Sequence, residues 1–301
     1  MMKVLLPIDF SDFSEAAISE VKRRPWPEST KLSILHVVET ITTGWIDPST
    51  YIADQTASAR KLVGEAAKQL SATGLQASDL VLCGYPPVLI PQYAEAWGAD
   101  LVIVGSHGAG GLARFLLGSV AKSVLQATQC SVEIFRLRER RENGAQMKIL
   151  LATDGSEYSE QAARAIAERP WPTGTIVKVL GVVELPPAGV DPWNAAAWVI
   201  DSLREERTKN AGDSVNQAES IVASAGLKTL TEVVAGHAKV TIIDNAKEWN
   251  ADLIALGSHG RRGFKRLLLG SVAETVALHA HCSVEVIRRT DGSQQENPSA
   301  A

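Results

Sequence analysis

The sequence contains two copies of one long segment, and this duplication limits the possible folds more than any other feature. The tetrapeptide Arg-Pro-Trp-Pro occupies residues 24–27 and again residues 169–172, a separation of 145. Gly-Ser-His-Gly occupies residues 105–108 and again residues 257–260, so the separation has grown to 152 and the second copy holds seven extra residues. Such a long period indicates a duplicated whole domain and not a solenoid of short repeats.

A chain of 301 residues has room for two domains of ordinary size. We expect one domain over residues 1–140 and a second over 146–290, joined by a charged stretch that ends in Asn-Gly. The polar residues 291–301 are expected to form a disordered tail. The composition, 45% hydrophobic and 21% charged, is typical of a soluble globular protein.

Charge, hydropathy and cysteine usage exclude several classes of protein. A net charge of −4 disfavours general binding to nucleic acid or to an anionic membrane. The chain begins directly with a strand pattern and has no apolar run of about 18 residues, so we expect a cytoplasmic protein without a membrane partner. Cys83, Cys130 and Cys282 form no close pair, which argues against disulfides and zinc, and each is expected to be buried.

Short apolar runs alternate with segments of helical periodicity in each copy. In the first copy the pattern predicts strands at residues 4–8, 32–38, 80–83, 101–104 and 132–137, and helices at 11–24, 52–72, 88–97 and 119–127. This alternation predicts an α/β fold, with a five-stranded parallel sheet in each domain and helices on both faces. Ligands of such doubly wound sheets bind beyond the carboxyl ends of the strands.

The strongest functional signal follows the fourth strand of each copy. Glycines recur there in the pattern G-2x-G-9x-G-S, at Gly105, Gly108, Gly118 and Ser119, and again at Gly257, Gly260, Gly270 and Ser271. Glycines let backbone N–H groups approach an anion, and the last pair opens a helix whose positive end favours phosphate. A tight turn with an ordinary helix cap is the alternative interpretation. No G-K-[ST] follows, so the motif is not a Walker A loop.

This glycine pattern, with Asp9 after the first strand and His-Val-Val at residues 36–38, resembles the ATP-binding branch of the universal stress protein family. The resemblance covers nearly the whole chain as two tandem domains. It implies the sheet order 3-2-1-4-5 in each domain and ATP as the ligand. It also implies that Asp9 and Asp154 hold the ribose and adenine, and that Val37 and Val182 contact the adenine. From the residues alone, the alternative is that the aspartates cap helices and that the valines belong only to the core.

The two copies differ around the glycine motif. Between the second and third glycines the first copy carries one cation, whereas the second carries four, beginning with Arg261. Cations near a triphosphate strengthen its binding, so we expect tighter binding of ATP in the second copy, although a solvated basic loop is the alternative. The second copy has Gly181 where the first has His36, which weakens the adenine side of its pocket.

Two further features bear on chemistry and assembly. His107 and His259 lie inside the glycine motif, and we expect them to bond the backbone of a turn, because no nucleophile accompanies them. The resemblance implies that the last strand of each domain, near residues 132–134 and 284–286, pairs with the same strand of a partner domain. Here the two domains could pair within one chain, and a homodimer stays a further option.

The sequence therefore predicts an ATP-binding regulatory protein of the stress response that need not break a bond. No catalytic base, Walker B partner or metal-ligand cluster is visible, although a triphosphate could bring magnesium. A slow ATPase or a phosphoryl or adenylyl transferase is one alternative function. An interaction module that binds no nucleotide is the other.

Overall fold

The computed structural model describes residues 1–40, 48–108, 117–137, 146–184, 197–260 and 269–288, and all structural statements below concern these residues. The expected linker and tail lie outside the described residues. The first half of the chain contains β1 (Lys3–Pro7), α1 (Asp12–Arg23), β2 (Lys31–Glu39), α2 (Pro48–Ser71), β3 (Gln76–Gly84), α3 (Pro86–Trp97), β4 (Leu101–Gly105), α4 (Ser119–Ala127) and β5 (Ser131–Phe135).

The second half repeats this order of elements. It contains β6 (Lys148–Thr153), α5 (Glu157–Glu168), β7 (Ile176–Val183), α6 (Ala197–Ser224), β8 (Lys228–Ala235), α7 (Ala238–Glu248), β9 (Leu253–Gly257), α8 (Ser271–His279) and β10 (Ser283–Ile287). Part of the extra length of the second half lies in α6, which has 28 residues where α2 has 24. No helix in the described part of the chain combines the length and apolar character needed to cross a membrane.

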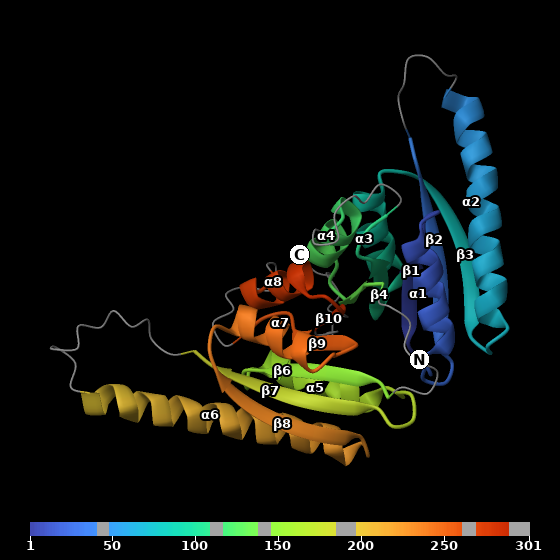
Figure 1. Cartoon of the computed structure of the whole chain (residues 1–301). Helices are drawn as coiled ribbons and strands as arrows, with labels where there is room; N and C mark the ends of the chain where they lie inside the picture. The colour runs from blue at the N-terminus through green and yellow to red at the C-terminus, as the bar shows by residue number, and fades with distance from the viewer. Residues whose placement is uncertain (41–47, 109–116, 138–145, 185–196, 261–268, 289–301) are drawn as a thin grey trace, which may run out of the picture.

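The ten strands form one sheet in the order β3-β2-β1-β4-β5-β10-β9-β6-β7-β8 (Figure 1). Strands within each half are parallel, and each half has the expected order 3-2-1-4-5. The two halves join through β5 and β10, which are antiparallel, with Glu133 opposite Glu285. The α/β fold and the pairing of the last strands within the chain are therefore confirmed. The free edges of the sheet are β3 and β8.

Alternating side chains of each strand supply two layers of core, because successive residues point to opposite faces of a sheet. On one face Leu5 belongs to a single continuous core that also includes Leu150 and runs under α3, α4, α7 and α8. On the other face Val4 belongs to a core under α1 and α2, while Ile149 belongs to a separate core under α5 and α6. The two halves thus share a core on only one side of the sheet.

The repeated Arg-Pro-Trp-Pro tetrapeptide lies at the seam between the halves. Arg24 donates to both carboxylate oxygens of Glu133, at 2.6 and 2.9 Å, and Arg169 donates to Glu285 at 2.7 and 2.8 Å. Burial alone would raise the pKa of Glu133, but the charges of Arg24 and Arg169 and the Arg24 hydrogen bonds outweigh burial and hold that pKa below its ordinary value. A buried four-charge cluster therefore spans the β5–β10 junction.

Strand β3 departs from the sequence prediction. It begins at Gln76, four residues before the predicted start at Leu80, and Cys83 within it is exposed and not buried. Only Cys130 and Cys282 are buried as expected. The reason is that β3 is an edge strand with one open side, so its polar residues pair in the ladder without needing an apolar pattern.

Candidate functional site

The predicted site residues converge at the carboxyl edge of each half-sheet. Asp9 follows β1, Gly108 follows the neighbouring strand β4, and a Cβ placed on Gly108 would lie 2.6 Å from Asp9 Oδ2. The second half repeats this contact, with a Cβ on Gly260 at 2.7 Å from Asp154 Oδ2. Residue 108 and residue 260 therefore have to be glycine if the carboxylate is to keep its place.

Each aspartate is oriented by the start of the helix that follows it. Asp9 Oδ1 accepts hydrogen bonds from the amide of Ser11 at 3.0 Å, from the Ser11 hydroxyl, and from Ser14 Oγ at 2.7 Å. Asp154 Oδ1 accepts from the amide of Ser156 at 3.0 Å. Ser11 and Ser156 are themselves the caps of α1 and α5, so neither aspartate caps a helix. Oδ2 of each aspartate is the oxygen that faces the glycine loop.

The third glycine of each motif caps a helix with its backbone alone. Gly118 is the cap of α4 and Gly270 the cap of α8, and no side chain of the described residues caps either helix start. Ser119 and Ser271 are thus the first helical residues and do not cap the helices. The first-turn amides of a helix have no partner within the helix, which leaves donors and a positive dipole end directed at this edge of the sheet.

The glycine loops are closed by the same hydrogen bond in both halves. The amide of Gly118 donates to Ser106 O at 2.8 Å, and the amide of Gly270 donates to Ser258 O at 2.8 Å. A Cβ at position 270 would lie 2.9 Å from that carbonyl oxygen of Ser258. These two amides are therefore occupied, and the amides that could donate to a ligand begin one residue later in each helix.

Gly105 and Gly257 have a packing role. A Cβ on Gly105 would lie 3.3 Å from Phe13 Cβ in α1, and a Cβ on Gly257 would lie 2.6 Å from the carbonyl carbon of Tyr158 in α5. Both glycines end a strand and let a helix approach the sheet closely. This contact explains why glycine stands at both positions, while direct contact of these two with phosphate stays a prediction.

Among the described residues, the hydrogen-bond partner of each motif histidine is a hydroxyl group, whereas the sequence predicted a backbone partner. His107 Nδ1 lies 3.1 Å from Ser106 Oγ, and His259 Nδ1 lies 3.1 Å from Ser258 Oγ. Within the described residues, Nε2 of each histidine is buried without a hydrogen-bond partner. Ser106 and Ser258 are each only 2% exposed, so neither hydroxyl can reach a substrate as a nucleophile.

The residues predicted to lie on the adenine side of the site differ between the halves. Val37 is buried within the shared core and Val182 packs against it, so both have the core role that the sequence left open. His36 Nδ1 lies 2.8 Å from Ile8 O. Gly181 has no room for a side chain, because a Cβ there would lie 2.7 Å from Val215 Cγ2 in α6. Helix α6 therefore packs closer to its strand at this point than a side chain would allow.

Phe10 is a candidate ligand contact that the sequence analysis missed. The residue is 57% exposed and follows Asp9 in the chain, and its ring meets the His36 ring edge-on with the centroids 5.3 Å apart. The equivalent position in the second half is Gly155. The available sequence signal was an aromatic residue within a polar segment directly after a predicted strand.

Some predictions concern residues outside the described part of the chain. Arg261 and the other cations of the second loop lie in residues 261–268, and the corresponding loop of the first half lies in residues 109–116. The charge comparison between the loops therefore stays a prediction. Within the described residues, no group of three or more histidine, cysteine, aspartate or glutamate side chains could hold a metal ion.

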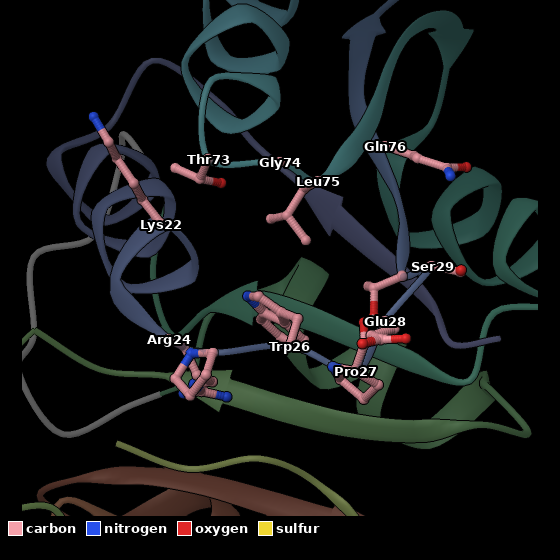
Figure 2. Close-up of a pocket in the computed structure, with 12 residues that line it drawn as sticks. Lys22, Arg24, Trp26, Pro27, Glu28, Ser29, Thr73, Gly74, Leu75 and Gln76 are labelled. Atoms are coloured by element: carbon pink, nitrogen blue, oxygen red, sulfur yellow. Dashed lines mark hydrogen bonds between the residues drawn. The ribbon is translucent and has the colours of Figure 1, made fainter. Parts of the chain in front are cut away.

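A hollow of about 310 Å³ lies at the opposite, amino edge of the first half-sheet (Figure 2). Its walls come from the segment between α1 and β2 and from the segment between α2 and β3. Several of its polar groups already have partners within the protein: Trp26 Nε1 donates to Val21 O, Thr30 Oγ1 to Pro27 O and Thr73 Oγ1 to Leu70 O. The carboxyl edge therefore remains the better candidate for ligand binding.

Comparison with known proteins adds an independent observation. The sequence profile of the Universal stress protein family matches residues 1–136 and again residues 147–288. A universal stress protein of Mycolicibacterium smegmatis is 26% identical over 295 residues, which cover 95% of this chain and 96% of that protein. One of Methanocaldococcus jannaschii is 32% identical over 142 residues, or 47% of this chain and 82% of its own length.

The solved structures agree at the level of the fold. The crystal structure of a universal stress protein from Archaeoglobus fulgidus matches with a TM-score of 0.65 and 23% identity, covering 97% of both chains. The family profile matches both copies of the internal repeat and together spans most of the chain. The chain therefore belongs to the universal stress protein family and carries two of its domains in tandem.

Proposed function

We propose that this chain is an ATP-binding regulatory protein of the stress response, and that one or both halves hold the nucleotide without rapid turnover. Membership of the universal stress protein family supports a role in the response to stress. The observation that carries the ATP proposal is the contact between Asp9 and Gly108, repeated by Asp154 and Gly260, beside a helix start that no side chain caps.

The proposed roles follow from this geometry. The Asp9 and Asp154 carboxylates accept hydrogen bonds from ribose hydroxyls, with their orientation held by the helix starts. The first-turn amides of α4 and α8, with the hydroxyls of Ser119 and Ser271, donate to the phosphates. Gly108 and Gly260 keep the space between carboxylate and loop open, and Arg261 adds charge in the second half.

Two differences between the halves have opposite expected effects on the affinity for ATP. The second loop carries more cations, which favours its phosphate side, while Phe10 and His36 give the first half an aromatic wall that Gly155 and Gly181 cannot supply. We retain the expectation that the second half binds ATP more tightly, because charge-assisted hydrogen bonds to a triphosphate are individually stronger than one exposed aromatic contact.

The function is tested on the purified full chain. Nucleotide that co-purifies is extracted and identified, and added ATP is followed for hours by chromatography. Intact bound ATP is the expected result. Steady release of ADP would instead indicate a slow ATPase, transfer of phosphoryl or adenylyl groups a transferase, and no binding at millimolar ATP an interaction module without nucleotide.

Matched variants assign binding to each half. Gly118→Val and Gly270→Val place a branched side chain against the closing carbonyl of each loop, and each is expected to abolish binding in its own half. Gly212→Ala, which adds a Cβ into open space on α6, is the control that should leave binding unchanged. A greater loss in Gly118→Val than in Gly270→Val would reverse the expected ranking of the two halves.

A further inference from the structure

One arginine of each half donates hydrogen bonds to main-chain carbonyl groups of the other half. Arg136 directly follows β5, and its guanidinium donates to Ala277 O, to Leu278 O at 3.2 Å and to Cys282 O at 3.3 Å. Those carbonyl groups lie at and just beyond the carboxyl end of α8. An arginine of the first half therefore caps the last helix of the second half.

An arginine of the second half makes the equivalent contact with the first half. Arg288 directly follows β10 and donates to Leu125 O, to Thr128 Oγ1 at 3.2 Å and to Cys130 O at 3.3 Å, all at the carboxyl end of α4. The main-chain amides of both arginines also cross the seam, to Ser283 Oγ and Ser131 Oγ respectively, at 3.2 Å each. This exchange brings α4 and α8 together, and Gln126 Nε2 donates to Glu274 Oε1 between them at 3.0 Å.

The two guanidinium charges are balanced by helix ends. Among the described residues, neither Arg136 nor Arg288 forms an ion pair with a carboxylate. Burial lowers the pKa of Arg136 to about 10 and also lowers the pKa of Arg288. The hydrogen-bonded carbonyls carry the negative end of a helix dipole, which makes this a favourable place for a buried cation.

The opposite ends of the same two helices are the candidate phosphate sites. Helix α4 begins at Ser119 after the Gly118 cap, and α8 begins at Ser271 after the Gly270 cap. Each helix has nine residues. At 1.5 Å per residue its length is only about 14 Å, so one rigid element joins an arginine of one half to the anion site of the other.

We propose that Arg136 and Arg288 are crossed positioning residues: Arg288 sets the phosphate affinity of the first half through α4, and Arg136 sets that of the second half through α8. The inference rests on the proposed function and adds regulation to it. The arginine fixes the carboxyl end of the helix, and because the helix is one short rigid element, the first-turn amides at its other end are thereby held in line with the phosphates. Each site consequently depends on the integrity of the opposite half.

The test measures each site separately in the full chain. Gly270→Val leaves only the first-half site and Gly118→Val leaves only the second-half site. Arg288→Met or Arg136→Met is added to each background, because methionine fills similar space without charge. ATP and inorganic tripolyphosphate are titrated by calorimetry. Arg164→Met is the matched control, because it removes an arginine from an exposed pair on α5.

The expected result is a crossed pattern. Arg288→Met should weaken both ligands about two- to fivefold at the first-half site and leave the second-half site unchanged, and Arg136→Met should do the reverse. Arg164→Met should change neither site. Equal losses at both sites, or no loss at either, would overturn the inference while leaving the proposed function intact. Absence of ATP binding in the unmodified chain would overturn the proposed function itself.

A second measurement covers variants that fold poorly. Arg288→Lys keeps the charge but loses the planar fork of donors, so it should bind ATP better than Arg288→Met. Hydrogen exchange in Arg288→Lys should speed up in residues 125–128 at the end of α4 and stay unchanged at the end of α8. Equal acceleration at both helix ends would mean that the arginine stabilises the molecule generally, and the crossed role would then be wrong.

Discussion

At the scale of single residues, the glycines of the two motifs fall into three physical classes. Gly105 and Gly257 let a helix pack on a strand end, and Gly108 and Gly260 leave space for a carboxylate. Gly118 and Gly270 close a loop onto the strand before it. A glycine outside these motifs, Gly181, belongs to the first class, because α6 packs against it.

Alanine substitution at two glycines should have opposite effects on stability. Gly181→Ala would place a Cβ 2.7 Å from Val215 Cγ2. Because this is closer than van der Waals contact, the substitution should lower the free energy of unfolding by about 1–3 kcal/mol. Gly64→Ala, inside α2 with no atom within 4 Å of the new Cβ, should raise it by about 0.5–1 kcal/mol. Urea denaturation of both variants checks this. A neutral Gly181→Ala would show that α6 can move away from β7.

At the scale of the elements, the three cysteines differ in burial according to where they lie in the sheet. Cys130 and Cys282 are buried at the seam, and burial raises the pKa of Cys130 to about 11. Cys83 is exposed on edge strand β3, with its Sγ 3.7 Å from Thr56 Oγ1 in α2. The thiolate is the reactive form of cysteine, so exposure and pKa together decide the order of reaction.

One thiol of the three should therefore react quickly. In the native protein at pH 8, a thiol reagent such as dithionitrobenzoate should modify Cys83 first, with Cys130 and Cys282 reacting only after denaturation. Peptide mass spectrometry after a short pulse identifies the labelled residue, and Cys83→Ser is the control that should remove the fast phase. Fast labelling of Cys130 would contradict a closed seam.

The elements also show how far sequence reasoning reaches. Buried strands such as β1 and β4 were predictable, because an apolar run bounded by a turn has few other uses in a chain of this length. The start of β3 was not predictable, because its polar first residues pair with β2 through the backbone and show no apolar pattern. Asp9 and Gly108 were predictable as neighbours because their strands are adjacent, whereas Phe10 depends on exposure, which periodicity does not report.

At the scale of the whole molecule, the charge cluster at the seam contributes to stability and makes part of it depend on pH. Glu133 is fully buried and opposite Glu285 in the antiparallel pair, and each glutamate has its own arginine. Since the pKa of Glu133 in the folded protein is lower than its ordinary value, the folded state binds a proton there less readily than the unfolded chain. The stabilisation is complete above the ordinary value of 4.5 and is lost as the pH falls through the lowered folded pKa.

The substitution Glu133→Gln measures how much the Glu133 charge contributes to the free energy of unfolding. The variant leaves Arg24 buried without its main counter-charge, so the free energy of unfolding at pH 7 should fall by about 3 kcal/mol. The difference between variant and unmodified chain should shrink as the pH falls from 4.5 through the lowered folded pKa, below which the glutamate is protonated in the folded unmodified chain as well. Glu160→Gln, in an exposed pair with Arg164, should change the stability by less than about 1 kcal/mol.

The β5–β10 junction also has a consequence for how the halves can diverge. A dimer of separate chains comes apart on dilution, but here the partner domain is covalently tethered and its effective concentration never falls. Identical halves are then unnecessary, because neither has to recognise a copy of itself. The position of Phe10 in the first half can therefore be Gly155 in the second, and the position of His36 can be Gly181, while the two halves stay assembled. Tandem fusion thus leaves the two candidate sites of one molecule free to diverge in sequence.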